Sequence, residues 1–317
     1  MIELNRLGLG TMGMSIVHNP ENSMKTIHAA LDAGITLFNT GEFYNGSESE
    51  LIVGQALKGV NHDNYFLSVK FGVLPSPEGG IYGLDVKPHN VKGHLTYSLR
   101  RLGLDYIDLY QPARQDTTVP VEDLVGAIAD QVQAGYVKHI GLSMVDTETL
   151  RRACAVHPIH TVEMEYSLIS RDIESELIAA AKELGVKVLA FGTVGHGLLR
   201  DNILDAPATP RFSHGLMAPE HREKNLAMIR KLKEIADEKG ATLSQLALAW
   251  SLAKYDHVQS LIGTTNPDHL HAAIDALKIE LSAEDITRIE TALDADKVGG
   301  KGMRNFVFTD GVMSLAE

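Results

Sequence analysis

The chain has a single cysteine, Cys154, among its 317 residues, so no disulfide can form within it. It also lacks an apolar stretch long enough to span a bilayer, a run of Lys or Arg, and the basic and apolar regions of a signal peptide at its start. Its formal net charge of −12 opposes binding to nucleic acid or to an anionic membrane. We therefore expect a cytoplasmic protein with neither of these partners.

Several motifs that would assign a chemistry are also missing. No Gly-x-Gly-x-x-Gly follows the first strand-like run, so the dinucleotide fingerprint of a doubly wound sheet is absent. No Gly-x-Ser-x-Gly or Ser-His-Asp pattern supports hydrolase chemistry. His157 and His160 have no acidic or cysteine partner at ligand spacing, which favours surface histidines over a metal site.

What the chain does contain is an alternation of short strand-like runs with longer segments of helical period, typical of βα units. The expected strands are 6–12, 35–39, 65–70, 106–111, 137–142, 161–163, 187–191 and 259–262. The expected helices are 22–33, 48–58, 88–102, 121–134, 147–156, 173–184, 220–239, 242–254 and 267–277. Eight such units predict an α/β fold, a (β/α)8 TIM barrel over residues 1–317 as a single domain, with a doubly wound sheet as the competitor.

Three segments, 72–88, 199–219 and 295–317, are too long for simple connections. In a barrel the first two follow strands and rise over the C-terminal mouth, and we expect the tail to fold back there as well. Loops in this place shape a substrate pocket. The alternative is that each segment is a disordered insertion.

A tyrosine and a lysine each follow a short apolar run. Tyr44 comes after the run at 35–38, and Lys70 directly follows the run at 65–69. In a strand–helix repeat both positions are C-terminal ends of neighbouring parallel strands, where barrels keep their chemistry. A nearby ammonium lowers the pKa of a phenol, so the pair predicts a proton donor near neutral pH. Reduction of a carbonyl needs that proton on oxygen while hydride reaches carbon.

Further motifs recur in a consistent order over nearly the whole chain. They are GITLFNT (34–40), SELIVGQAL (49–57), LRRLGLDYIDLY (99–110), GLS (141–143), EYSL (165–168) and HGLL (196–199). Together they resemble the aldo/keto reductases. The resemblance implies a (β/α)8 barrel that binds NADPH without a Rossmann domain, and a tetrad of Asp, Tyr, Lys and His at the ends of successive strands.

Two members of that tetrad are matched and two are not. Tyr44 matches the general acid and Lys70 the cation beside it, but Asn39 stands where the family has Asp and Ala113 where it has His. The departures resemble a sub-branch, the pyridoxal reductases, and imply reduction of pyridoxal to pyridoxine. The stretches that carry this finer likeness are 39–44, 113–116, 165–174 and 196–199.

The departures leave several roles open. Asn39 can still accept a hydrogen bond from the Lys70 ammonium. Glu42 either supplies a replacement carboxylate or points to solvent. With no His at position 113, either Gln111 or Arg114 could be the second donor to the substrate oxygen. The alternatives are that Gln111 only fills the barrel and that Arg114 forms a salt bridge with Asp116. Tyr82 is a further candidate for holding a planar substrate.

The resemblance also places cofactor contacts. Ser143 matches the residue that binds the nicotinamide carboxamide; Met144 departs from the family's Asn, and Glu163 from its Gln, although Glu163 can accept from the amide. Phe191 either stacks on the nicotinamide or belongs to the core. The remaining candidates are Gly192 and Gly197 along the pyrophosphate, and Gly263, Thr264, Thr265 and His269 near the 2′-phosphate.

The predicted function is NADPH-dependent reduction of an aldehyde or ketone, with NADH not excluded. Other aldehydes, sugars or xenobiotic ketones are the alternative substrates. A cofactor-binding regulatory subunit with little turnover is the alternative from another class, and a different TIM-barrel enzyme is the third. No oligomeric partner can be recognised.

Overall fold

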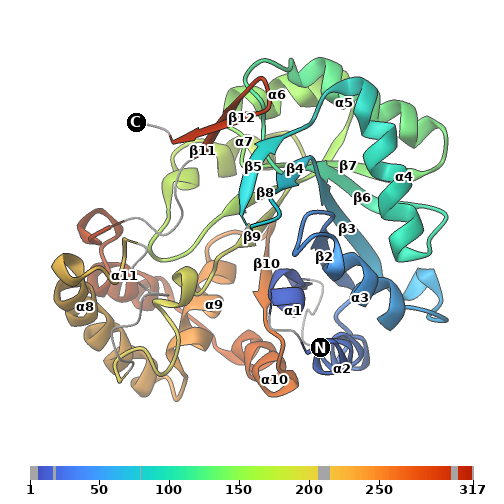
Figure 1. Ribbon diagram of the computed structural model, residues 1–317. Coiled ribbons are helices and arrows are strands. Elements are labelled where there is room, and N and C mark those ends of the chain that lie inside the picture. The colour runs from blue at the N-terminus through green and yellow to red at the C-terminus, as the bar shows by residue number, and fades with distance from the viewer. Residues whose placement is uncertain (1–5, 17–18, 79, 206–214, 301–305, 316–317) are drawn as a thin grey trace.

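Eight parallel strands close into a barrel in the order β1-β10-β9-β8-β7-β6-β3-β2 in a computed structural model of the chain (Figure 1). The structure describes residues 6–16, 19–78, 80–205, 215–300 and 306–315. The barrel strands are β1 (Leu7–Gly10), β2 (Leu37–Gly41), β3 (Phe66–Phe71), β6 (Ile107–Pro112), β7 (Val137–Ser143), β8 (Ile159–Glu165), β9 (Lys187–Phe191) and β10 (Val258–Gly263). The predicted (β/α)8 barrel is confirmed, and the doubly wound alternative is wrong.

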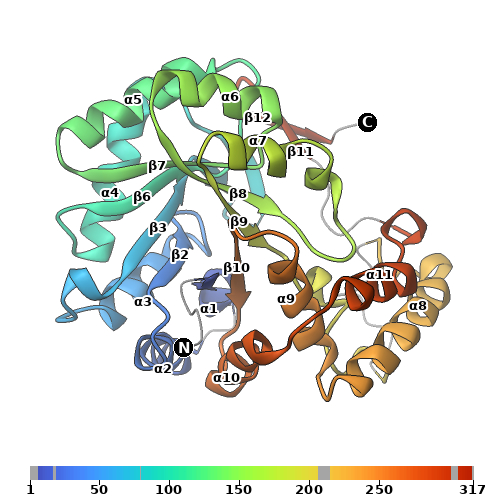
Figure 2. The ribbon, with the colours of Figure 1, turned by 180° about the vertical axis from the view of Figure 1, so that it is seen from behind.

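Helices surround the barrel on its outside (Figure 2). They are α1 (Met12–Ile16), α2 (Pro20–Asp32), α3 (Glu48–Ala56), α4 (Val91–Leu102), α5 (Val121–Gln133), α6 (Thr147–Val156), α7 (Leu177–Glu183), α8 (Pro219–Glu238), α9 (Leu243–Ala253), α10 (Pro267–Asp275) and α11 (Ala283–Ala292). The expected strand 6–12 was too long, because β1 ends at Gly10 and α1 begins at Met12; α1 and α11 were not predicted. Across the described ranges no helix combines the length and apolar character needed to cross a bilayer.

Apolar and aromatic side chains fill the lower part of the barrel. Leu37, Leu189 and Leu261 form a buried cluster in its interior. Gly8 faces them, and a Cβ at this position would lie only 2.7 Å from the Leu37 side chain. The glycine therefore leaves the space that the leucine occupies.

Phe66 and two histidines stack next to this cluster. The ring centroids of Phe66 and His160 are 5.5 Å apart, and those of His139 and His160 are 4.7 Å apart. The expectation that His160 is a simple surface histidine is therefore wrong. Burial, followed by the charges of His139 and Lys187, lowers the pKa of His160 from 6.5 to about 4.

A second sheet lies beside the barrel and joins distant parts of the chain. Its order is β11-β12-β5-β4, formed by β4 (Val73–Pro75), β5 (Ile81–Leu84), β11 (Phe306–Thr309) and β12 (Val312–Leu315) (Figure 1). The described part of the tail thus folds back onto segment 72–88, as expected, and neither is a disordered insertion. Much of the third long segment, 206–214, lies outside the described residues.

Asp116 anchors the turn between β11 and β12. Its side chain is buried and accepts hydrogen bonds from the backbone N–H groups of Asp310 at 3.1 Å and Gly311 at 2.5 Å. The N–H of Thr117 donates to the carbonyl of Phe308 at 2.9 Å. Phe308 is itself buried. The C-terminal hairpin is therefore fixed to the loop that follows β6.

The pKa of His160 predicts a pH dependence of stability. Between pH 6.5 and about 4 the unfolded chain binds a proton at this residue that the folded chain does not bind, so the free energy of unfolding falls as the pH falls through this window. His160→Gln removes that contribution, about 1 to 3 kcal/mol across the window. Denaturant unfolding at a series of pH values measures it, with His157→Gln as the control; parallel curves for wild type and His160→Gln would contradict the prediction.

Candidate active site

Tyr44 and Lys70 meet at the C-terminal end of the barrel, as the sequence predicts. Gly41 at the end of β2 is in register with Lys70 on β3. Tyr44 lies in the turn that follows, where its backbone N–H donates to the Gly41 carbonyl at 3.1 Å. The Lys70 ammonium lies 5.3 Å from the centroid of the Tyr44 ring. Lys70 is buried and Tyr44 half-buried, so the phenol is the more accessible of the two.

The buried ammonium has a carboxylate partner that the sequence analysis placed elsewhere. Lys70 Nζ lies 3.0 Å from Glu163 Oε1 and 3.3 Å from Glu163 Oε2, and both side chains are about 5% exposed or less. Asn39 Oδ1 accepts a further hydrogen bond from the ammonium, as expected. The negative neighbour of Lys70 is therefore Glu163, which β8 supplies from across the barrel.

Two amide side chains complete the environment of Glu163. Its Oε2 accepts from Asn39 Nδ2 at 2.7 Å and from Gln111 Nε2 at 2.6 Å. Both amides also donate to Ser68 Oγ, at 3.1 and 3.2 Å. Gln111 is fully buried, and its amide hydrogens are both engaged. Gln111 thus fills the barrel, as the alternative has it, and its role as a donor to the substrate oxygen stays a prediction.

Gly141 on β7 makes room for this arrangement. A Cβ at position 141 would lie 2.7 Å from Gln111 Oε1. The marker sequence at 141–143 therefore has a packing reason as well as a possible functional one.

Electrostatics give Tyr44 the opposite pKa direction from the one expected. Burial raises the pKa of Tyr44, and Glu163 raises it further, whereas Lys70 and Arg114 lower it; the net direction is upward. Burial opposes the charge on Lys70, but Glu163 and Tyr44 outweigh burial and raise the pKa of Lys70. At neutral pH the site therefore holds a protonated Tyr44 phenol beside an ion pair whose two charges balance.

Arg114 is close enough to Tyr44 for its charge to act on the phenol. Its guanidinium donates to the Ala113 carbonyl at 2.6 Å and is half-buried. Burial lowers the pKa of Arg114, and the negative charges of Tyr44, when ionised, Glu163 and Glu165 oppose that shift. The alternative salt bridge with Asp116 is not formed, since Asp116 binds the C-terminal hairpin.

Glu42 follows neither of its two expected courses. It is buried, accepts the Gly72 N–H at 2.7 Å and lies 2.8 Å from His94 Nδ1. Its carboxylate therefore positions the start of segment 72–88, and only its backbone N–H contacts Lys70, by donating to the Lys70 carbonyl at 2.9 Å.

The nicotinamide candidates sit on neighbouring strand ends. Ser143 and Glu163 are in register on β7 and β8, and the Ser143 hydroxyl is buried without a hydrogen-bond partner. A carboxamide group would satisfy that hydroxyl. Phe191, at the end of β9, packs against the leucine cluster yet stays partly exposed, so both of its alternatives remain open.

The loops expected near the phosphates have two different characters. Gly192 and Gly197 have positive φ angles of 70° and 89°, which glycine adopts easily. At the start of α10, Thr264 Oγ1 accepts from the Asn266 N–H at 3.1 Å, and Asn266 caps the helix through the Asp268 N–H at 2.8 Å. Among the candidates in this turn, Gly263 and His269 are exposed, while Thr264 and Thr265 are half-buried.

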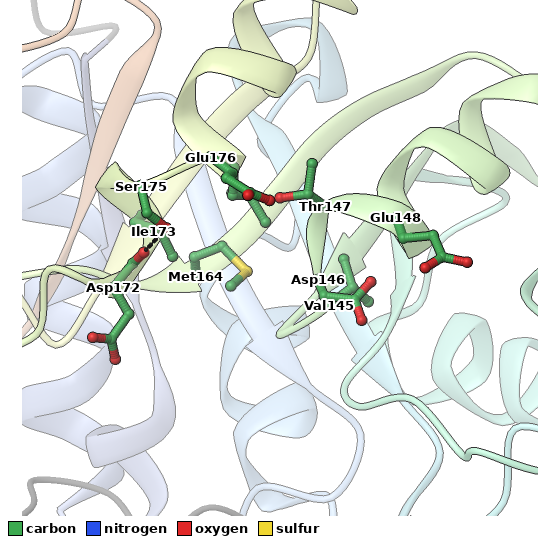
Figure 3. A pocket seen from close by; sticks show the side chains of 10 residues that line it. Val145, Asp146, Thr147, Glu148, Met164, Asp172, Ile173, Ser175 and Glu176 are labelled. Carbon is green, nitrogen blue, oxygen red and sulfur yellow. Dashed lines mark hydrogen bonds between the residues drawn. The ribbon is translucent and has the colours of Figure 1, made fainter.

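Two surface features lie apart from these residues. Tyr82 on β5 is 60% exposed, and its side chain makes no hydrogen bond or ring contact with the residues described, so the structure does not bring it to Tyr44. A cavity of about 450 Å³ lies between α6 and α7 and is lined by Met164 and by acidic residues including Glu148 and Asp172 (Figure 3). It contains none of the candidate catalytic residues.

Comparison with known proteins decides the family. The sequence model of the aldo/keto reductase family matches residues 6–294. A probable aldo-keto reductase of Glycine max is 34% identical over 307 residues, covering 94% of this chain and 88% of that protein. The chain belongs to the aldo/keto reductase family. It is accordingly an NAD(P)H-dependent oxidoreductase that acts on carbonyl groups.

Solved aldo/keto reductase structures share the fold. A glycerol dehydrogenase of Gluconobacter oxydans is 27% identical, with a TM-score of 0.82 and 92% of each chain covered. An aldo-keto reductase of Bacillus halodurans in its holo form is 27% identical, with a TM-score of 0.76 and 92% of each chain covered. An aldo/keto reductase of Klebsiella pneumoniae in complex with NADP and acetate is 25% identical, with a TM-score of 0.72 and 90% of each chain covered.

Met144, which follows Ser143, has a backbone conformation that suits Asn better than Met. Its φ is +52°, in the left-handed region that Asn enters more easily than other side chains. We expect Met144→Asn to be about 1 kcal/mol more stable than Met144→Ala, because both variants lose the thioether and only Asn relieves the backbone. Denaturant unfolding measures the difference, and equal stability of the two variants would show that the backbone at 144 is unstrained.

Proposed function

We propose that this aldo/keto reductase uses NADPH to reduce an aldehyde or ketone, with Tyr44 as the proton donor. The observation that carries the proposal is the accessible Tyr44 phenol above the buried Lys70–Glu163 ion pair. When bound, the cofactor supplies the hydride. The protein supplies a positioned proton and keeps it on the phenol, because the pKa of Tyr44 is raised.

Arg114 is the proposed second donor to the substrate oxygen, in place of the family histidine. Position 113 is a buried alanine and cannot donate. The Arg114 charge acts on Tyr44, and a guanidinium has five N–H donors, of which one is used by the Ala113 carbonyl. Negative charge that develops on the oxygen during hydride transfer is stabilised by such a cation.

The proposed cofactor contacts follow the strand ends of the barrel. Ser143 and the free capacity of Glu163 Oε1 suit the carboxamide, and Phe191 offers a ring face. Gly192 and Gly197 let backbone approach the pyrophosphate. The turn with Gly263, Thr264, Thr265 and His269 precedes and opens α10, whose N-terminus attracts the 2′-phosphate. The NADP in the Klebsiella pneumoniae relative supports NADPH over NADH.

Pyridoxal is the proposed substrate at the finer level. Its aldehyde lies next to an ionisable ring hydroxyl, and Arg114 beside Tyr44 suits that pair of oxygens. The block at 165–174 gives this idea little support, since Tyr166 donates to Glu174 at 2.6 Å and Lys254 contacts Glu174 at 2.7 Å in a network between helices.

We further propose that residues 1–317 act as one domain in the cytoplasm, in keeping with the acidic charge and the lone cysteine.

Loss of NADPH absorbance against a panel of carbonyls tests the function. Wild type should consume NADPH with pyridoxal among the better substrates and with a higher kcat/KM than with NADH. Tyr44→Phe should lower kcat by about 100-fold or more while NADPH still binds, because only the proton donor is lost. Phe43→Leu, next to Tyr44 in the same turn, is the matched control for packing.

The same assay separates the alternatives. Activity on other aldehydes without pyridoxal would keep the reductase and reject the finer substrate. NADPH that binds and is not consumed with any carbonyl would favour a regulatory subunit. Near-wild-type turnover of Tyr44→Phe would remove Tyr44 from the mechanism.

The position of Arg114 predicts a preference among aromatic aldehydes. Wild type should reduce 2-hydroxybenzaldehyde about tenfold more efficiently than 3-hydroxybenzaldehyde, since a charge-assisted contact to the neighbouring oxygen is worth about 1.5 kcal/mol. Arg114→Leu should lower kcat/KM for both and abolish the ratio between them. A ratio that survives in Arg114→Leu would assign the preference to another residue.

A further inference from the structure

The Lys70 ammonium is buried at a level of the barrel where it needs a negative partner. Its side chain is 5% exposed, and removing a charge from water at such a place costs several kcal/mol unless an opposite charge compensates. The strand beside it, β2, offers only the neutral Asn39. The negative charge comes from Glu163 on β8, which is separated from β3 by β6 and β7.

Positions 39 and 163 both differ from what the resemblance implies, and they differ in opposite senses. The resemblance set out above implies Asp at 39 and Gln at 163; this chain has Asn at 39 and Glu at 163. The exchange keeps one carboxylate and one amide, and it keeps their hydrogen bond, with Asn39 Nδ2 donating to Glu163 Oε2 at 2.7 Å. It also keeps the total charge around Lys70.

We infer that β8 supplies the carboxylate that holds the proton-donating pair, which makes Glu163 the positioning residue for Lys70 and Tyr44. This inference rests on the proposed function for its effect on catalysis. Glu163 Oε2 already receives hydrogen bonds from Asn39, Gln111 and Lys70, so this oxygen is committed to the protein. Oε1 contacts only Lys70 and is the one oxygen left for a cofactor amide.

The charges around the pair set the expected pH behaviour. Tyr44 is influenced by Lys70, by Glu163 from β8 and by Arg114 from the loop after β6, and Arg114 in turn by Glu165. Glu163 raises the pKa of Tyr44, so removing its charge lets the phenol ionise at lower pH. Restoring a carboxylate at position 39 should reverse that change.

The experiment removes the carboxylate at position 163 and then restores one at position 39. Glu163→Gln should lower kcat about tenfold at neutral pH and move the alkaline limb of reduction down by about one pH unit, since a close charge alters a pKa by about that much. Asn39→Asp in the Glu163→Gln background should return both to within about threefold of wild type. Asn39→Asp alone places two carboxylates in contact, and we expect it to add an ionisation in the acidic limb.

A cofactor-free measurement accompanies the kinetics. Ultraviolet difference titration of each variant against its own Tyr44→Phe counterpart reports the ionisation of Tyr44 directly. It should move down in Glu163→Gln and return in the double variant. Glu50→Gln is the control, because Glu50 is equally buried and paired with an arginine, Arg101, outside the site; it should leave the Tyr44 titration unchanged.

The outcomes separate this inference from the proposed function. An active wild type whose Glu163→Gln variant keeps the wild-type titration, or whose double variant stays like Glu163→Gln, overturns the role of Glu163 alone. A wild type inactive on every carbonyl overturns the proposed function, while the titration still tests the exchange. If Glu163→Gln does not fold, recovery of folded protein in the double variant is the same rescue, and its failure overturns the inference.

Discussion

A positive charge enclosed in the barrel is the constraint on which the upper half of this structure depends. Glu163 compensates the charge of Lys70 there, and Glu163 is in turn held by donors from three strands. Asn39 and Gln111 each donate one amide hydrogen to Glu163 and the other to Ser68. The polar layer is therefore one connected network, and a change at one member alters the hydrogen bonds of the others.

The layer beneath has the opposite character. Leucines from three strands and stacked aromatic rings fill the barrel on the side away from the network. Lys70 and Glu163 are themselves buried, and their attraction is stronger there than it would be in water. The filling confines the accessible part of the site to the mouth, where Tyr44 and Arg114 lie. The direction from which a substrate can approach is thus a result of core packing.

The alternation of strands and helices was readable from the sequence because each barrel strand is a buried apolar run between capped helices. Gly34, Gly103, Gly135 and Gly185 all have the positive φ expected of helix-ending glycines. The second sheet was missed because its strands have only three or four residues, and because its two hairpins join through β12 and β5, which are far apart in the sequence.

The site divides in the same way. Tyr44 and Lys70 follow from their place at strand ends, and Asn39 as a hydrogen-bond acceptor follows from its chemistry. The role of Glu163 and the direction of the Tyr44 pKa depend on contacts across the barrel and on burial, which no local pattern records. One signal was available, since the family residues at 39 and 163 depart in opposite senses, and a paired exchange of acid and amide indicates contact.

The anchor of the C-terminal hairpin lies two residues from Arg114. Asp116 accepts hydrogen bonds from the backbone N–H groups of residues 310 and 311. The same short loop carries Arg114, whose charge acts on the Tyr44 phenol. The hairpin of β11 and β12 is in this way part of the scaffold for the reacting end. A change that loosened this hairpin would reach the guanidinium through the loop that holds Asp116.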